Sequence, residues 1–408
     1  MTISQKLSAI LCCPSCSMPV RVQDDTVLSE DGSTVYPIFK GIPWMIPNPQ
    51  YSILDWQIKI SALYEHLLNT SKQLVKEAPL ESALTRQRLE RLSLGKAEFA
   101  RSLLDLTSPI MQSPPDRQLL RATLKDQAPR LQTVLSYEAN VYRDWVWGGE
   151  ENRAYCDVVM ALLSTARPER VFIPGAGAGR LAHDLEKALS PSLLVAGDIN
   201  PFLLFVAQRL MAGESIPLYE FPSEPVSLDD VVVQQHLSVE NGASHVELVF
   251  SNLLQNPFLP ASFDALITPW LVDILPYRFS NILRAINRCL PEGGCWINFG
   301  SLVFHHRSVA ACYTFEELSD VVRAHGFEIE KHSLHEMPYL RSPHNAGYRM
   351  EKVWAWRAVK TKDVEPPERE QVLPLWILDD GLPVPALAPF SQSSQHQLIT
   401  GEILSWAN

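Results

Sequence analysis

The chain has 408 residues and a formal net charge of −11, with acidic and basic side chains interspersed along it. This length predicts two or three domains, and the absence of a basic stripe excludes the usual pattern of a nucleic-acid-binding protein. Seven mostly scattered cysteines favour a reducing compartment, and we find no signal-peptide pattern and no apolar run long enough to span a bilayer. We therefore expect a cytoplasmic protein with neither nucleic acid nor membrane as partner; its oligomeric state stays open.

Residues 1–48 alternate short β-type runs with turn residues and predict a small β-ribbon domain. It contains one CxxC pair, Cys13 and Cys16, directly after Cys12. A structural zinc site needs four ligands, typically two such pairs. No second pair or histidine follows before His66, so Cys13 and Cys16 are either remnants of a lost metal site or ligands completed by another group, and we assign no metal ligands.

Residues 49–150 predict a helical segment. Apolar residues recur at three- and four-residue spacing within 53–68, 91–106 and 131–145, and Pro114 and Pro115 separate the second stretch from the third.

Residues 151–360 alternate strand and helix patterns and predict an α/β domain, which leaves a proline-rich appendage at 361–408 with no assigned role. Continuous apolar strands separated by helices indicate a mostly parallel sheet covered on both faces. The predicted strands are 171–174, 193–197, 247–250, 264–268, 294–299, 326–331 and 351–358. The predicted helices are 179–189, 201–212, 278–289 and 314–325.

A glycine-rich loop, "PGAGAGR", follows the first of these strands. The dinucleotide fingerprint GxGxxG needs glycine or alanine at its sixth position, and that position is Arg180. The loop therefore favours S-adenosylmethionine (SAM) over NAD, with Asp198 after the second strand placed to accept the ribose hydroxyls. A tight strand-to-helix turn, and a helix cap at Asp198, are the structural alternatives. The predicted cofactor-binding residues are Gly175, Gly177, Gly179, Arg180, Asp198, Asn200, Asn252 and Leu253.

Longer stretches are more specific. The segments "VYRDWVWGGEENRAYCDVV", "VFIPGAGAGRLAHDL", "ITPWLVDILP" and "CWINFGSLVFHH" resemble the carnosine N-methyltransferase family over roughly residues 130–360. The resemblance implies a class I methyltransferase fold, which is a Rossmann-like sheet of seven mostly parallel strands. It also implies SAM as cofactor and methylation of an imidazole ring nitrogen.

The chemistry gives a reason for one acidic residue in these segments. Imidazole is largely neutral at pH 7, so its tautomer must be controlled rather than its charge. A carboxylate that accepts one ring N–H leaves the other nitrogen with its lone pair free. Asp273, just past the fourth strand, is our candidate for this catalytic role, against a helix cap or a buried ion pair.

The resemblance also implies substrate contacts. His305 matches the family histidine that contacts the imidazole, and the adjacent His306 is its competitor. Trp270 precedes Asp273 in the same motif, and Tyr339 and Tyr348 lie where the family supplies ring-contacting tyrosines, although either is equally consistent with a buried core aromatic. Asn252 stands where the family usually has aspartate toward adenine, and Arg180 is placed for the cofactor carboxylate, with a turn asparagine and a solvated arginine as the alternatives.

The amino-terminal ribbon, with "CPSC" and "VYPIFKGIPWMIP", resembles the small zinc-ribbon protein that activates several methyltransferases as a separate subunit. We therefore predict an enzyme that methylates a small histidine derivative: histidine, a carnosine-like dipeptide or 5-thiohistidine. The alternatives are a protein or tRNA methyltransferase with a fused activator, and a cofactor-binding module without catalysis.

Overall fold

The computed structural model describes residues 3–111, 133–239, 244–304 and 309–367. Its first part is a four-stranded antiparallel sheet in the order β1-β2-β3-β4, preceded by the short helix α1 (Gln5–Ser8). The strands are β1 (Val20–Gln23), β2 (Thr26–Ser29), β3 (Val35–Phe39) and β4 (Ile42–Pro43). The sheet agrees with the β content expected for residues 1–48.

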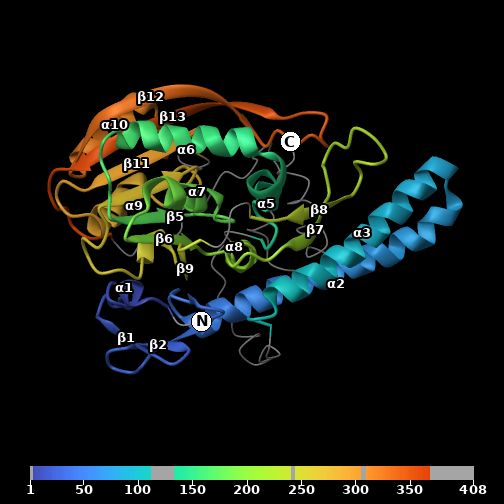
Figure 1. Ribbon diagram of the computed structural model, residues 1–408, viewed down its shortest axis with the longest axis horizontal. Helices are drawn as coiled ribbons and strands as arrows, with labels where there is room; N and C mark the ends of the chain where they lie inside the picture. The colour runs from blue at the N-terminus through green and yellow to red at the C-terminus, as the bar shows by residue number, and fades with distance from the viewer. Residues whose placement is uncertain (1–2, 112–132, 240–243, 305–308, 368–408) are drawn as a thin grey trace.

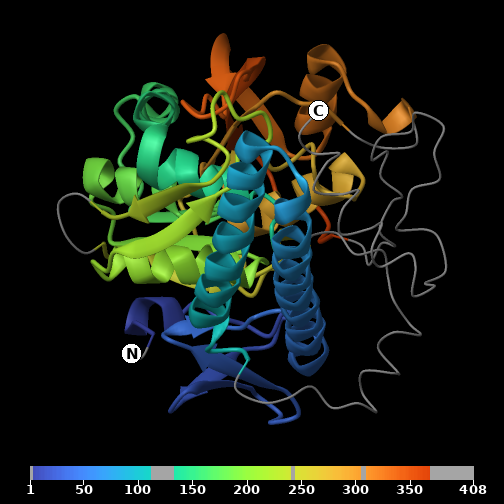
Figure 2. The same ribbon diagram turned by 90° about the vertical axis from the view of Figure 1, so that its right-hand side faces the viewer.

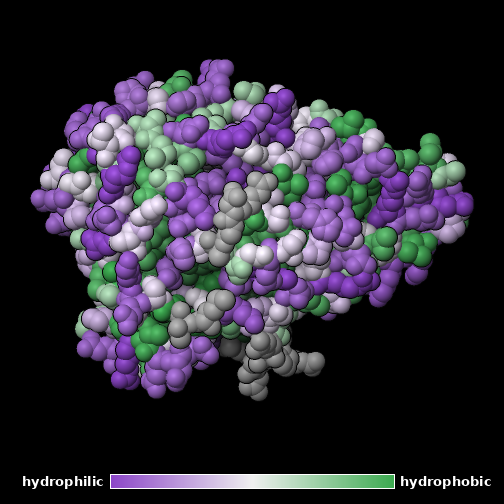
Figure 3. Space-filling model, in the orientation of Figure 1, coloured by the Kyte–Doolittle hydropathy of each residue, from purple (hydrophilic) through white to green (hydrophobic). Residues whose placement is uncertain are grey.

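A long helical hairpin follows and projects away from the rest of the molecule (Figure 1). It consists of α2 (Pro49–Glu77) and α3 (Ala83–Thr107), joined by the 3-10 turn η1 (Ala78–Leu80). Pro49 occupies the first helical position, where its missing N–H costs nothing. Apolar side chains at the tip of the hairpin are exposed among polar ones (Figure 3); these include Val75, Leu80 and Leu84.

The third predicted helical stretch, 131–145, begins outside the described residues. Its described part forms the short helix α5 (Glu138–Tyr142), which runs into a π-helical turn, η2 (Arg143–Trp147). Helix α6 (Gly149–Leu163) comes next and crosses the boundary that the sequence analysis placed at residue 150. This helix packs on the core sheet.

The core is a seven-stranded sheet in the order β12-β13-β11-β10-β5-β6-β9. Within it β13 runs antiparallel to both of its neighbours, and the other pairs are parallel. The strands are β5 (Arg170–Pro174), β6 (Leu193–Asp198), β9 (Glu247–Phe250), β10 (Ala265–Pro269), β11 (Cys295–Gly300), β12 (Phe327–Tyr339) and β13 (Arg349–Lys360). This order, with one antiparallel strand next to the edge, is the class I methyltransferase fold that the sequence predicts.

Helices cover both faces of this sheet. On one face α6, α7 (Arg180–Leu189) and α8 (Pro201–Met211) bury Val171 and Ile173, and on the other α9 (Phe279–Cys289) and α10 (Phe315–Ala324) bury Phe172. The alternation follows from the period of two in a strand. Short 3-10 turns follow β9 and precede α10, namely η3 (Leu253–Gln255) and η4 (Val309–Ala311).

A second small sheet was not predicted. The antiparallel hairpin of β7 (Ile216–Glu220) and β8 (Val233–Leu237) lies against α3. Gly95 of α3 makes this approach possible, because a Cβ there would come within 2.4 Å of the side chain of Val232. The hairpin thereby links the helical segment to the core.

The amino-terminal sheet docks on the edge of the core sheet that is formed by β9, opposite the β12 edge (Figure 1 and Figure 2). Trp44 forms a parallel bridge with Phe250 and the two rings lie 4.5 Å apart. The N–H of Met45 donates to the carbonyl of Phe250 at 2.9 Å, and that of Cys12 to Pro257 at 2.7 Å. The edge strand β9 is therefore covered within this chain.

Candidate active site

The glycine loop between β5 and α7 adopts the geometry that its residues predict. Gly175, Gly177 and Gly179 have φ angles of +66°, +57° and +80°, which disfavour side chains. A Cβ on Gly175 or Gly179 would meet Leu271 or Met211 at under 3 Å, whereas one on Gly177 would meet nothing within 4 Å. Packing therefore explains two of the glycines, and the open space at Gly177 leaves backbone that a ligand can approach.

Asp198 at the end of β6 faces this loop. Its carboxylate accepts the backbone N–H of Gly177 at 2.9 Å and that of Asn200 at 2.9 Å. Burial raises the pKa of Asp198, and the hydrogen bonds from Asn200 and Gly177 oppose that rise. A buried carboxylate thus lies beside open glycine backbone, and its role toward the ribose hydroxyls of an adenosine cofactor stays a prediction.

The other predicted cofactor residues have structural partners. Asn200 caps α8 by accepting the N–H of Phe202, and its amide group donates to the carbonyl of Val134 at 3.2 Å. Asn252 caps η3 by accepting the N–H of Leu254 at 3.0 Å, which leaves its NH2 group out of that bond, and Leu253 is buried beside it. Asn252 and Leu253 directly follow the edge strand β9, which is separated from β5 by β6 in the sheet.

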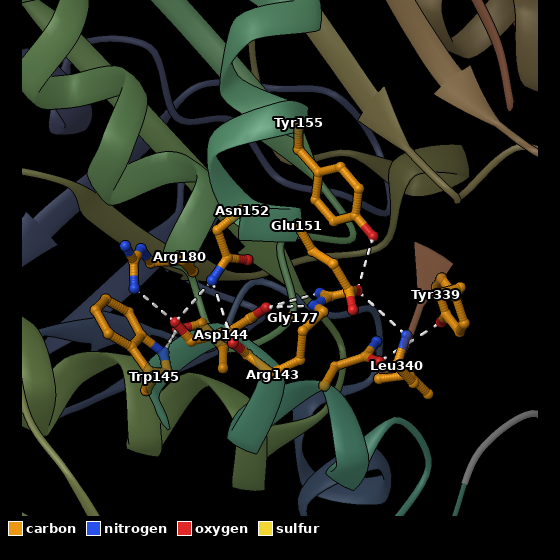
Figure 4. A network of polar contacts seen from close by, with 12 residues as sticks. Arg143, Asp144, Trp145, Glu151, Asn152, Tyr155, Gly177, Arg180, Tyr339 and Leu340 are labelled. Atoms are coloured by element: carbon orange, nitrogen blue, oxygen red, sulfur yellow. Dashed lines mark hydrogen bonds and ion pairs between the residues drawn. The ribbon is translucent and has the colours of Figure 1, made fainter. Parts of the chain in front are cut away.

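Arg180 contacts protein groups around the loop. Its Nε lies 2.9 Å from Asp184, its Nη1 donates to the carbonyl of Asp144 at 2.7 Å, and its guanidinium lies 5.3 Å from the centre of the Trp145 ring. These contacts hold the start of α7 against η2 (Figure 4).

The Arg143-Asp144-Trp145 motif lies directly behind the glycine loop (Figure 4). Trp145 donates its indole N–H to the carbonyl of Ala178 in that loop at 2.9 Å. Arg143 and Asp144 form a buried ion pair at 2.7 Å, and Asn152 donates to both of their backbone carbonyls. Burial alone would lower the pKa of Arg143, but the carboxylate of Asp144 raises it, so Arg143 keeps its charge.

Asp273 lies in the turn after β10 and is 4% exposed. Its carboxylate accepts the N–H of Val303, in the segment after β11, at 2.9 Å. Burial raises the pKa of Asp273 to about 6, and the negative charge of Glu351 adds to the rise. The structure therefore places this carboxylate at the carboxyl edge of the sheet, where open α/β folds bind ligands.

Trp270, three residues before Asp273, is the centre of a group of aromatic rings that we call the aromatic wall: Trp270, Tyr155, Phe299 and Tyr339. Trp270 contacts Tyr155 of α6, Phe299 of β11 and Tyr339 of β12, with ring centres 4.6, 5.1 and 5.8 Å apart respectively. Trp270 has a positive φ of +43°, an unusual backbone conformation for a bulky residue. Strain of this kind is typical of functional sites.

The two predicted tyrosines, Tyr339 and Tyr348, lie in different environments. Tyr339 is buried in the aromatic wall, and its hydroxyl donates to Asn140 at 3.5 Å. Tyr348 is 50% exposed, and the guanidinium of Arg341 lies 5.3 Å from its ring. Only Tyr339 therefore shares this wall with Trp270. His305 and His306 lie outside the described residues.

Tyr137 was missed by the sequence analysis. Burial raises its pKa, and Tyr339, Asp273 and Asp198 raise it further, so the phenol lies within electrostatic reach of both candidate carboxylates. Tyr155 and Glu151 were missed as well; Glu151 accepts the N–H groups of Leu340 and Arg341 and so holds the turn after Tyr339 (Figure 4). The sequence signal that could have identified these residues was their position close to the Arg-Asp-Trp motif, with Tyr137 before it and Glu151 and Tyr155 after it.

Two other features concern the described residues only. They contain no group of three or more histidine, cysteine or acidic side chains arranged to hold a metal ion, and Cys13 instead lies 3.1 Å from the hydroxyl of Tyr36. In the same ranges no helix has the length and apolar character needed to cross a membrane.

Comparison with known proteins gives a consistent result. The sequence profile described as carnosine N-methyltransferase matches residues 121–362. Carnosine N-methyltransferases of Dictyostelium discoideum, Schizosaccharomyces pombe and Rattus norvegicus are 26%, 24% and 25% identical over 42%, 52% and 46% of this chain. The chain spans 40%, 66% and 52% of their respective lengths.

Solved structures are more distant. The N-methyltransferase NodS of Bradyrhizobium japonicum, in complex with S-adenosylhomocysteine, is 13% identical, with a TM-score of 0.38 over 56% of this chain and 98% of its own. The profile match covers more than half of the chain and includes the glycine loop, Asp198, Asp273 and the aromatic wall. The chain belongs to the carnosine N-methyltransferase family, whose members are SAM-dependent methyltransferases.

Proposed function

We propose that this protein methylates an imidazole ring nitrogen of a small histidine derivative. The observation that carries the proposal is the buried carboxylate of Asp273 at the carboxyl edge of the sheet, three residues after Trp270, whose ring contacts that of Tyr339. An imidazole ring is flat and apolar on its faces and polar at its two nitrogens, so it matches an aromatic wall with one acceptor at its rim.

The cofactor half of the site has a simple division of roles. Asp198 accepts the ribose hydroxyls, the backbone of Gly177 lies against the ligand, and the free amide group of Asn252 donates to the adenine edge. SAM supplies an electrophilic methyl group on a positively charged sulfur. Arg180 is the candidate for the cofactor carboxylate that the family resemblance supplies, because Arg143 is already paired with the carboxylate of Asp144.

In the substrate half, Asp273 controls the tautomer. Its carboxylate accepts the N–H of one ring nitrogen, which directs the lone pair of the other nitrogen toward the methyl group. The new nitrogen–carbon bond forms as the sulfur–carbon bond breaks, and the positive charge that develops on the ring is stabilised by the carboxylate. The ring proton then leaves through Asp273 to solvent. His305, at the family position for the imidazole contact, and His306 remain proposals from sequence.

The relatives are named for carnosine, and by analogy we propose carnosine as one candidate substrate of this chain. Histidine and 5-thiohistidine present the same ring and are equally compatible with Asp273. The fused amino-terminal sheet covers the edge strand β9, and we propose that it replaces a separate activator subunit. A cytoplasmic location and the domain limits near residues 48, 150 and 360 remain predictions.

The test is incubation with isotopically labelled SAM and a panel of histidine, carnosine, 5-thiohistidine, a histidine-containing peptide and tRNA. We expect the label on the ring nitrogen of one of the first three compounds, read by mass spectrometry of the product. Label on the peptide or tRNA alone would overturn the proposal in favour of a macromolecular substrate. No label on any of them, with SAM bound, would indicate a binding module.

A further inference from the structure

Two oppositely charged side chains stand together at the start of β13. Arg349 and Glu351 are two residues apart on the strand and therefore project from the same face of the sheet. Their charged groups lie 3.1 Å apart, and their side chains are 64% and 12% exposed respectively. The pair thus runs from the surface into a partly buried position.

Both members contact the aromatic wall of the candidate site. The carboxylate of Glu351 accepts the indole N–H of Trp270 at 2.9 Å. The guanidinium of Arg349 lies 4.8 Å from the centre of the Tyr339 ring. The pair therefore contacts both Trp270 and Tyr339, the two rings beside which we place the imidazole.

The pair also has an electrostatic connection to Asp273. The negative charge of Glu351 contributes to the raised pKa of Asp273, so the two carboxylates lie within electrostatic reach of each other. A ligand that carries a positive charge near each carboxylate would relieve that repulsion. A ring that becomes cationic on methylation, with an ammonium group a few bonds away, has this charge pattern.

A free α-amino acid carries its ammonium and carboxylate groups on one carbon atom. Placed alongside Arg349 and Glu351, it sets its carboxylate against the guanidinium and its ammonium against the carboxylate, so all four charges alternate. In a β-alanyl dipeptide the two termini are several bonds apart, and an internal histidine of a protein has neither charge. The close spacing of Arg349 and Glu351 therefore favours a free α-amino acid over a β-alanyl dipeptide or an internal histidine.

We propose that Arg349 and Glu351 bind the head group of a free α-amino acid whose imidazole side chain reaches Asp273. This inference rests on the proposed function and narrows it to histidine or a ring-substituted histidine. Arg349 and Glu351 are specificity-determining residues and do not touch the reacting atoms.

The first experiment varies the head group of the substrate. Initial rates with labelled SAM are compared for histidine, N-acetylhistidine, histidinamide, histamine and carnosine. We expect histidine to have the highest kcat/KM and each lost charge to lower it roughly 10- to 100-fold, mainly through KM. Equal kcat/KM for all five compounds would overturn the inference while leaving the proposed function intact.

The second experiment varies the protein. Arg349→Gln removes the cation, and Glu351→Gln removes the anion while keeping an acceptor for the Trp270 indole. We expect Arg349→Gln to lower kcat/KM for histidine but to change that for histidinamide little, since the amide already lacks the carboxylate. Arg323→Gln, in an exposed ion pair with Asp320 on α10, is the matched control and should behave as wild type.

A binding measurement separates this inference from the proposed function. Calorimetry with S-adenosylhomocysteine present measures the affinity for histidine without any turnover. Binding that weakens roughly tenfold or more in Arg349→Gln supports the head-group site even when no methyl transfer occurs. Unchanged affinity in both variants, with melting temperatures equal to wild type, rejects it.

Discussion

The two halves of the carboxyl edge of the core sheet are built differently. In the half that we propose for the cofactor, after β5, β6 and β9, Asp198 receives a hydrogen bond from Gly177, 21 positions away in the sequence. In the substrate half, after β10, β11 and around β12–β13, Trp270 contacts Glu351 across 81 positions and Tyr339 contacts Asn140 across 199. Local backbone makes the first half, and long-range side-chain contacts make the second.

The electrostatics of the two halves differ too. Asp198 accepts the backbone N–H groups of Gly177 and Asn200, whereas Asp273 accepts that of Val303 and lies within electrostatic reach of a second carboxylate, Glu351. The cofactor half thus satisfies its charge with fixed dipoles of the chain, while the substrate half leaves charge to be matched by a ligand.

The strongest test of the comparison is Asp273→Asn. We expect kcat with the imidazole substrate to fall roughly 10²- to 10³-fold, because the amide does not stabilise the developing positive charge. Affinity for S-adenosylhomocysteine, measured by calorimetry, should stay within about twofold of wild type. Asp229→Asn, on an exposed ion pair with Arg91, is a matched substitution that should leave both quantities unchanged. Full turnover in Asp273→Asn would remove the carboxylate from its assigned role.

The second test uses pH and stability. The folded-state pKa of Asp273, about 6, lies above the unfolded value of about 3.9, so the native protein disfavours the charged form. Its contribution to stability is fully present below about pH 4 and is lost as the pH rises through about 6. Relative to wild type, Asp273→Asn should therefore gain up to ~3 kcal/mol in free energy of unfolding between pH 4 and pH 7. Denaturant titrations at the two pH values measure this, and a pH-independent difference would contradict the buried carboxylate.

In the cofactor half, Asp198→Asn should weaken SAM binding roughly 10- to 100-fold, because charged acceptors for the ribose hydroxyls and for the Gly177 N–H are lost. At saturating SAM, kcat should change far less. Kinetics at varied SAM concentration separate the two quantities, and the head-group preference described above should be unaffected. A change in that preference would mean that the two halves are not independent.

The smallest expected effect is at Asn252. Asn252→Ala removes the cap of η3 and should cost ~1 kcal/mol of stability, with a several-fold rise in KM for SAM. Asn252→Ser keeps a capping oxygen but lacks the amide group, so it should restore the melting temperature; recovery of KM as well would assign the effect to loop geometry rather than to adenine contact. Wild-type stability and wild-type KM in Asn252→Ala would show that neither the cap nor the adenine contact matters.

The sequence predicted the central strands to within one residue at each end, because continuous apolar runs bounded by turn residues can only be buried strands here. Strands β12 and β13 were predicted too short, at 326–331 and 351–358, since their outer parts extend past β11, pair only with each other and carry charged residues such as Glu336 and Arg349. The β7–β8 hairpin was missed because its stability comes from packing against α3, which no local pattern reveals.

By itself the sequence determined the fold, the glycine loop, Asp198 and the position of Asp273, since each depends on residues close together along the chain. The tertiary structure alone decided that Tyr339 and not Tyr348 joins Trp270, that Tyr137 lies within reach of both carboxylates, and that Arg349 and Glu351 border the aromatic wall. These groups come from segments far apart in sequence, and their meeting is set by strand register and helix packing, for which a single sequence carries no periodic signal.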